Sequence, residues 1–297
     1  MVVQEELGII KSFRDYYNER DVAVTKHFMR AAEIVDEESI HELRVEIKKT
    51  RAFLELIKGV TPYFDLKKAY SPIRTLFKMA APIRDSQVLQ TMTREYIAEV
   101  GLNVNISEYF NLLKQKEMAG KKDFIKLCKK FDLTIFKKNW ASVEKALGSL
   151  SKSVRSEACY ENRLITYSKD YIISLFGTLS DKQNQAELKE EDFHDIRILC
   201  KKSRYTLEIL SSLFEPNSFE LLNSSLKSIH QPLGHWHDTD EAINLLNRVL
   251  SYQSLRPLFC ESSYNDMLQS FSVRKQHFND LFLEKFKKLN LKEIMRQ

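Results

Sequence analysis

Two segments of the chain carry histidine, arginine and lysine at the same spacing. The pattern H-x-x-R-x-x-x-K-K-x-R runs from His41 to Arg51 and again from His194 to Arg204, 153 residues later. Guanidinium and ammonium groups bind phosphate and carboxylate oxygens, and an imidazole can add a further donor or charge. The repeated spacing therefore predicts two copies of one site that binds a polyanion.

Both segments have the periodicity of an amphipathic helix. On a helical wheel Arg44, Lys48 and Arg51 lie on the same side as His41. The opposite side carries Leu43, Ile47, Thr50, Leu54 and Ile57 in the first copy and Ile196, Cys200, Leu207 and Leu210 in the second. Each helix should pack one face and present a basic stripe on the other. Like charges at this spacing cost about 0.2–0.5 kcal/mol per pair, and a bridging multivalent anion would offset that cost.

The residues before each stripe resemble capping boxes. Ser39-x-x-Glu42 has this form, and Asp192-x-x-Asp195 stands at the same place in the second copy. They place His41 and His194 in the first helical turn, beside free backbone N–H groups and the positive end of the helix dipole. There an anion would bind readily and would raise the pKa of the imidazole.

The same offset relates a second pair of segments. Arg84-Asp85-Ser86 corresponds to His237-Asp238-Thr239, Arg74 to Lys227, and Lys78 to Gln231. Arg74 and Lys78 share a helix face and could extend the basic surface. Asp85 and Asp238 are expected to be structural, either capping a helix or bonding an arginine.

The elements that position these residues are predicted to be helices. Glycine and proline are scarce, with 7 and 6 residues, and 43% of the 297 residues are hydrophobic. This composition favours an all-α fold with short loops. The first half should contain helices at 3–34, 40–58, 71–98 (opened by Ser71-Pro72 and kinked at Pro82) and 104–147 (broken near Gly120). The second half should contain helices at 156–178, 193–213, 218–250 and 262–290. We therefore expect two four-helix units, 1–150 and 151–297, joined near 148–155.

Charge and cysteine content narrow the class of protein. The net charge of +5 is modest, so clustering of the charges matters more than their sum. The four cysteines are scattered without a CxxC pair, which argues against a zinc knuckle or a disulfide framework and favours a reducing cytoplasm. No apolar run of about 20 residues predicts a membrane span, and the N-terminus lacks the form of a signal peptide.

These motifs resemble the CHAD family, the conserved-histidine α-helical domain. The family has a basic His-x-x-Arg helix and a later segment of the (Leu-Gly)-x-x-Arg-Asp type, each in two halves. The corresponding segments here are His41 to Arg51 with Arg84-Asp85, and His194 to Arg204 with Leu233-Gly234 and His237-Asp238. The resemblance covers nearly the whole chain.

The resemblance implies two four-helix bundles, related by pseudo-twofold symmetry, that bind inorganic polyphosphate in a basic groove or channel between them. It also implies that the protein could associate with polyphosphate granules. One wall would contain His41, Arg44, Lys48, Lys49, Arg51, Arg74, Lys78 and Arg84. The other would contain His194, Arg197, Lys201, Lys202, Arg204, Lys227 and His237.

This chain departs from the family pattern at three places. His237 stands where the first half has arginine, Gln231 replaces a cation, and Ala80-Ala81 replaces Leu-Gly. We therefore expect weaker binding near that end of the second half.

Three other functions compete with this prediction. An enzyme acting on polyphosphate would need metal-binding carboxylates, and the chain lacks the E-x-E-x-K motif of the related tunnel triphosphatase domain, so a non-catalytic protein without cofactor is expected. His230, His235 and His237 could form a metal site with His194, but the first half has no equivalent histidines after His41. Nonspecific binding of RNA or DNA would use the same cations and would need exposed aromatic rings for stacking.

Overall fold

The described part of the protein is built from helices. A computed structural model describes the chain except residues 1, 62, 152–156, 214–218, 252–260 and 290–297. The residues that it does describe form nine helices and no strand, which confirms the all-α prediction. The helices are α1 (Val2–Glu33), α2 (Glu37–Val60), α3 (Leu66–Val100), α4 (Ser107–Cys128), α5 (Ile135–Ser151), α6 (Glu157–Gln183), α7 (Glu190–Leu213), α8 (Glu220–Ser251) and α9 (Glu261–Lys288).

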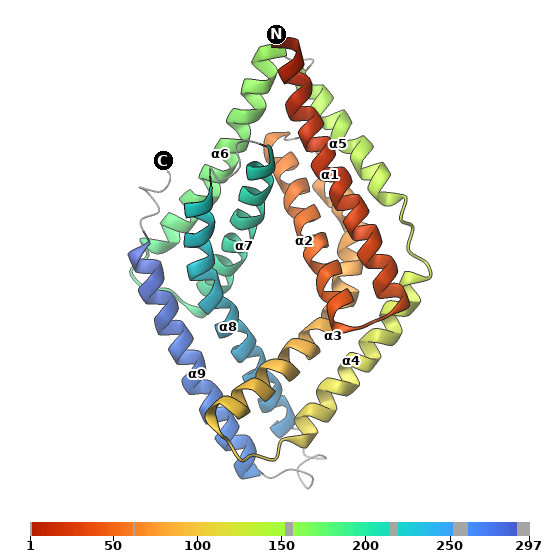
Figure 1. The fold of residues 1–297 in the computed structure, drawn as a ribbon. Helices are drawn as coiled ribbons and strands as arrows, with labels where there is room; N and C mark the ends of the chain where they lie inside the picture. Colours follow the sequence, from red (N-terminus) through yellow and green to blue (C-terminus); the bar gives the residue numbers. More distant parts are fainter. Residues whose placement is uncertain (1, 62, 152–156, 214–218, 252–260, 290–297) are drawn as a thin grey trace.

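The helices form a diamond-shaped frame (Figure 1). α1, α5 and α6 make its upper sides, and α4 and α9 make its lower sides. α2 and α7 run upward inside the frame and approach each other at the top, while α3 and α8 cross below them. None of the helices in the described ranges is long and apolar enough to cross a bilayer.

Two buried clusters hold this frame together, and each draws on both halves of the sequence. The larger combines residues such as Phe53 of the first half with Ile196 of the second. The smaller lies where the far ends of α3, α4, α8 and α9 meet, with Tyr109 and Phe271 among its fully buried members. The hydrophobic core therefore does not divide between residues 1–150 and 151–297, and that division remains a prediction.

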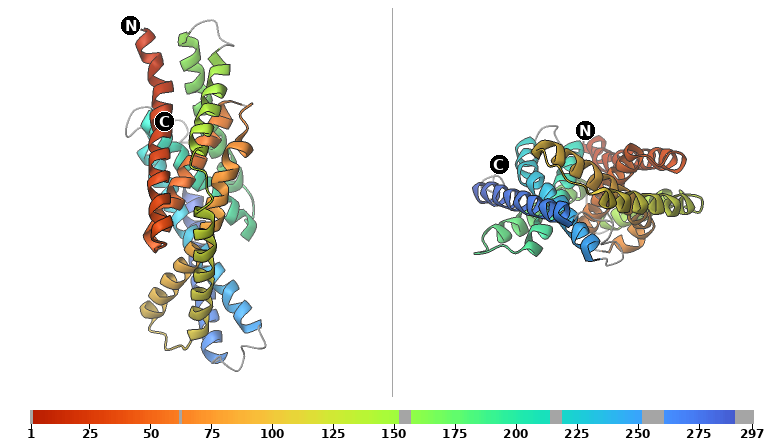
Figure 2. Two further views of the ribbon diagram at one scale, coloured as in Figure 1. Left: turned by 90° about the vertical axis from the view of Figure 1, so that its right-hand side faces the viewer. Right: turned by 90° about the horizontal axis from the view of Figure 1, so that it is seen from below.

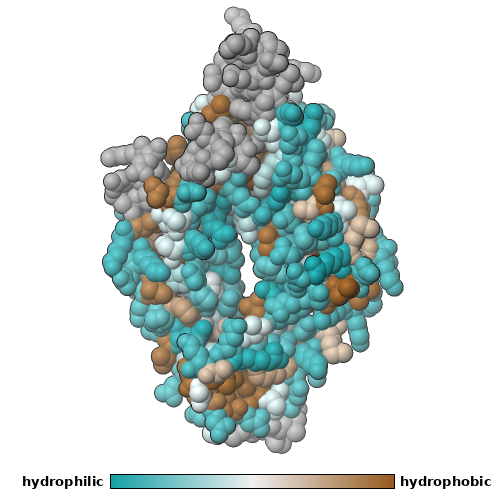
Figure 3. Space-filling model, in the orientation of Figure 1, coloured by the Kyte–Doolittle hydropathy of each residue, from teal (hydrophilic) through white to brown (hydrophobic). Residues whose placement is uncertain are grey.

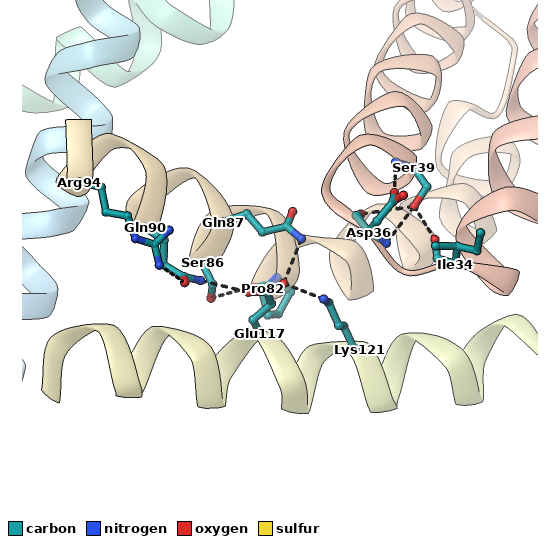
Figure 4. A network of polar contacts seen from close by, with 10 residues as sticks. All are labelled: Ile34, Asp36, Ser39, Pro82, Ser86, Gln87, Gln90, Arg94, Glu117 and Lys121. Atoms are coloured by element: carbon teal, nitrogen blue, oxygen red, sulfur yellow. Dashed lines mark hydrogen bonds and ion pairs between the residues drawn. The ribbon is translucent and has the colours of Figure 1, made fainter. Parts of the chain in front are cut away.

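The fourth expected helix, 104–147, is two helices. Residues 129–134 separate α4 from α5, and the predicted break near Gly120 is wrong. Gly120 lies inside α4, at the point where α3 passes close by. A glycine suits this position because a Cβ atom there would lie 3.0 Å from Cγ1 of Ile83. Figure 4 shows the polar contacts beside this crossing, where Glu117 accepts hydrogen bonds from Gln87 (3.1 Å) and Gln90 (3.0 Å).

α3 begins earlier than Ser71-Pro72. The Asp65 side chain caps it by accepting a hydrogen bond from the Lys68 amide (2.9 Å), and Pro72 and Pro82 both lie inside the helix. α3 ends at Val100 and is followed by the C-cap residue Gly101, whose φ of 65° is left-handed. α6 continues to Gln183, five residues beyond the expected end at 178. Part of the predicted linker near 148–155 lies outside the described residues.

Candidate functional site

The two basic helices begin one turn earlier than the sequence indicated. In α2 the Asp36 carboxylate accepts a hydrogen bond from the Ser39 amide (2.7 Å), and the Ser39 hydroxyl accepts one from the Asp36 amide (3.3 Å) (Figure 4). In α7 the Lys189 amide donates to the Asp192 carboxylate (2.8 Å). Asp36 is thus the N-cap of α2, and Ser39 and Asp192 are the third residues of their helices.

This start changes the position of the two histidines. His41 and His194 are each the fifth residue of their helix, where the backbone N–H already bonds a carbonyl one turn back. The prediction that they flank free N–H groups is therefore wrong. Both side chains are exposed.

The packing faces of α2 and α7 match the prediction. Leu43, Ile47, Leu54 and Ile57 are fully buried, as are Ile196, Cys200 and Leu207 of the second copy. Their burial orients the charged residues of both helices toward the space between α2 and α7.

That space is an opening bordered by hydrophilic residues (Figure 3). Arg44 and Lys48 of α2 lie near Arg197 and Lys201 of α7. All four side chains are half-buried.

The two pairs lie close enough to perturb one another. Burial lowers the pKa of Lys48 to about 8, with further contributions from Arg44 and Arg197. Burial lowers the pKa of Lys201 to about 7, assisted by Arg197 and Lys48. Because each lysine is affected by cations of the other helix, the two basic stripes face each other.

Two aspartates supply the nearest negative charge. Asp85 Oδ1 lies 3.8 Å from Nη2 of Arg44. At the matched position Asp238 interacts with Arg197, although burial raises the pKa of this carboxyl group. Asp85 therefore lies within ion-pair distance of an arginine, which is one of the two structural roles expected for it.

The two halves differ beside these arginines. Arg44 donates a hydrogen bond to the Phe77 carbonyl (3.0 Å) and stacks on the Phe77 ring at 4.2 Å. His230 occupies the matched position in α8, and burial together with Lys201 and Arg204 lowers its pKa to about 3. Among the described residues, His230 Nε2 and Arg197 Nε are buried without a hydrogen-bond partner.

Lys49 and Lys202 do not face the opening as free cations. Lys49 Nζ lies 2.9 Å from Glu208 Oε1, and Lys202 Nζ lies 3.4 Å from Glu55 Oε2. These are reciprocal ion pairs, because Lys49 and Lys202 are matched by the 153-residue offset and so are Glu55 and Glu208. Sequence reasoning missed both glutamates, although the shared offset would have revealed them.

The remaining predicted residues are paired with carboxylates, packed beside an aromatic ring or exposed on helix surfaces. Arg51 pairs with Glu55 (2.8 Å), and Arg84 pairs with Glu37 (2.6 Å). Arg204 is half-buried beside the Tyr205 ring, at 5.8 Å. Residues exposed on the helix surfaces are Arg74, Lys78 and Lys227.

The histidines considered as metal ligands point to different surroundings. His237 lies beside His194 (ring centroids 5.9 Å apart), whereas His235 stacks on Phe278 at 4.9 Å. Burial, Arg197 and His194 lower the pKa of His237 to about 4. Within the described ranges no three histidine, cysteine or carboxylate side chains gather as a metal site.

Comparison with known proteins now identifies the family. The sequence profile of the CHAD domain matches residues 22–247. The crystal structure of the CHAD domain from the plant Ricinus communis superposes with a TM-score of 0.72 at 18% identity, over 96% of this chain and 93% of that one. PptA from Streptomyces chartreusis gives a TM-score of 0.62 at 12% identity, over 94% of this chain and 99% of that one. No curated protein matches. The chain belongs to the CHAD family, whose known association is with inorganic polyphosphate.

Proposed function

We propose that the protein binds inorganic polyphosphate, without chemical change, in the opening between α2 and α7. The observation that carries this proposal is the convergence of Arg44, Lys48, Arg197 and Lys201 from the two copies of the basic motif. Four half-buried cations, whose two lysines have pKa values lowered by burial and by the neighbouring arginines, favour an anion with several charges. A linear polyphosphate offers oxygens to both walls at once.

The types of donor also suit this ligand. Arginine forks bind two phosphate oxygens, and lysine supplies a mobile point charge. A well-placed charge-assisted hydrogen bond contributes about 1.5–3 kcal/mol, so several together are enough for sub-micromolar affinity.

Nucleic acid is a less suitable ligand for the same site. Binding of single strands relies on aromatic faces that stack on bases. Here the ring of Phe77 is covered by Arg44 at 4.2 Å, and that of Tyr70 by Arg51 at 5.3 Å. Tyr171 is likewise faced by Lys202 at 5.3 Å. Bases would have to displace these cations before stacking.

The test is a calorimetric titration with polyphosphate of defined length, beside RNA of equal phosphate content, at about 50 and about 200 mM salt. We expect saturable binding of polyphosphate that exceeds that of RNA at both salt concentrations. Arg44→Gln and Arg197→Gln should each weaken it about tenfold or more. Lys129→Gln and Lys130→Gln, on exposed residues after α4, are the matched controls.

Two results would contradict the proposal. Equal losses from the control variants would mean diffuse attraction by surface charge. Release of inorganic phosphate from polyphosphate during incubation with Mg²⁺ would mean that the protein is an enzyme. Circular dichroism should show unchanged helicity in every variant, which separates loss of binding from loss of fold.

A further inference from the structure

An uninterrupted basic stripe follows the exposed surface of α3. Lys67, Arg74 and Lys78 are exposed and lie within about 40° of one another on the helix, with Ser71 beside them. The stripe spans about 16 Å. In the described part of the chain none of these three cations has a carboxylate within ion-pair distance. The opposite side of α3 is buried through Ile73 and Leu76.

α8 lacks this stripe at the matched positions. Glu220, Ser224, Lys227 and Gln231 stand 153 residues after Lys67, Ser71, Arg74 and Lys78. All four are exposed, as they are on α3. The α3 positions carry three positive charges, whereas those of α8 carry one positive and one negative charge that cancel.

The two surfaces lie on opposite faces of the molecule. The side view in Figure 2 shows the N-terminal half of α3 on one face and the N-terminal half of α8 on the other. In Figure 1 the N-terminal half of α8 lies in front, and the N-terminal half of α3, drawn fainter, lies behind. At the matched positions the α3 face therefore carries three positive charges, whereas the charges on the α8 face cancel.

The stripe is continuous with the proposed binding site. The Arg44 guanidinium lies over Phe77 and bonds its carbonyl, and Lys78 is the next residue of α3. Two turns earlier along α3, Arg51 lies 5.3 Å from the Tyr70 ring, and Arg74 follows one turn after Tyr70. An anion that leaves the cations of α2 on this side meets those of α3 directly.

Nearby carboxylates do not interrupt this path. Asp85 lies 3.8 Å from Arg44, and Glu55 is paired with Arg51. Asp65 stands at the start of α3, where its side chain accepts the Lys68 amide hydrogen bond.

We propose that a polyphosphate chain longer than the opening continues from its α3 side along Lys67, Arg74 and Lys78. The part of a long chain that extends beyond the opening is therefore bound on this side. This inference rests on the proposed function and adds a second binding surface to it. Each cation that neutralises a phosphate releases a condensed counterion. Long chains thus gain affinity from contacts that short chains cannot reach.

The test compares tripolyphosphate with long-chain polyphosphate on the full chain. The α3 variant carries Lys67→Gln, Arg74→Gln and Lys78→Gln. The matched control carries Lys122→Gln, Lys129→Gln and Lys130→Gln, three exposed lysines of α4 and the residues after it. We expect the affinity of the α3 variant for the long chain to fall about tenfold. The slope of log affinity against log salt concentration should become shallower by about two. Its affinity for tripolyphosphate should fall no further than that of the control.

A gain of binding provides a second measurement. Glu220→Lys with Gln231→Lys builds the missing stripe on α8 and should raise long-chain affinity without changing tripolyphosphate affinity. The inference is overturned if the α3 variant and the control lose equal affinity for the long chain. It is also overturned if the α3 variant loses as much affinity for tripolyphosphate as for the long chain. Failure of the unmodified protein to bind either probe would instead overturn the proposed function itself.

Discussion

The Nζ atom of Lys49 on α2 lies 2.9 Å from Oε1 of Glu208 on α7, and this ion pair joins the two halves of the chain. Its counterpart, Lys202 with Glu55, is reciprocal. The pairs link α2 to α7, so two lysines of the basic motif stabilise the frame around the opening. The adjacent lysines, Lys48 and Lys201, remain available to a ligand.

The Lys49–Glu208 pair should contribute measurably to stability. Since the Glu208 side chain is 43% exposed, solvent screening limits the coupling free energy to about 0.5–1 kcal/mol. Urea unfolding of Lys49→Ala, Glu208→Ala and the double variant gives this quantity directly. The exposed Lys126–Asp123 pair, with side chains 77% and 59% exposed, is the control and should give less. Equal coupling in both cycles would argue against an anchoring role.

Lys48 and Lys49 are neighbours in sequence, but neutralising them should affect different properties: affinity for Lys48 and stability for Lys49. Lys48→Gln removes a half-buried cation that faces Arg197, so tripolyphosphate affinity should fall about tenfold or more. Lys49→Gln breaks an ion pair and should lower stability while changing affinity little. Calorimetry and urea unfolding of both variants make the comparison. A larger affinity loss in Lys49→Gln would contradict the assignment.

Binding in the opening should take up protons above neutral pH. In the free protein Lys201 loses its proton as the pH rises through about 7, and Lys48 does so through about 8. A bound anion favours the charged amines, so affinity should fall between about pH 7 and about pH 9. Lys201→Arg stays charged and should weaken this dependence. Titrations in buffers of different ionisation enthalpy count the protons taken up, and none taken up would refute the linkage.

The same two lysines set the sign of a stability change in the free protein. Their folded-state pKa values lie below the unfolded value of about 10.4, so the unfolded chain binds more protons between about pH 7 and about pH 10. Stability without ligand should therefore rise with pH across this window. Thermal unfolding of the free protein measures it, and a decline across the window would contradict the lowered pKa values.

His230 should make the fold sensitive to acid. Its folded-state pKa is about 3, below the unfolded value of about 6.5, so stability should fall as the pH drops through this interval. His230→Phe introduces the residue type found at the matched position, Phe77, and should make the decline in stability shallower. His277→Phe, on an exposed histidine, is the control. The idea fails if both variants follow the unmodified protein in urea unfolding at low pH.

The sequence alone was sufficient for the fold class, the family and the inner faces of the basic helices. Helical periodicity is local, so the apolar positions of α2 and α7 could be assigned from spacing, and Leu43, Ile47, Ile196 and Cys200 are indeed fully buried. The repeat was visible because charged residues at matched positions need no structure to be compared. Helix ends were less predictable: Ser39 is a good N-cap residue by type, yet Asp36 caps α2 because its side chain reaches the Ser39 amide.

Only the tertiary structure decided which cations act together. Lys48 and Lys49 have the same side chain and adjacent places in the motif, but α7 presents Glu208 to one and Arg197 to the other. Likewise, only the close approach of α3 to α4 explains why a glycine stands inside α4 at position 120. These outcomes depend on contacts between residues far apart in sequence. The period of a helix determines which face is apolar, whereas the packing of distant helices determines what each charged side chain meets.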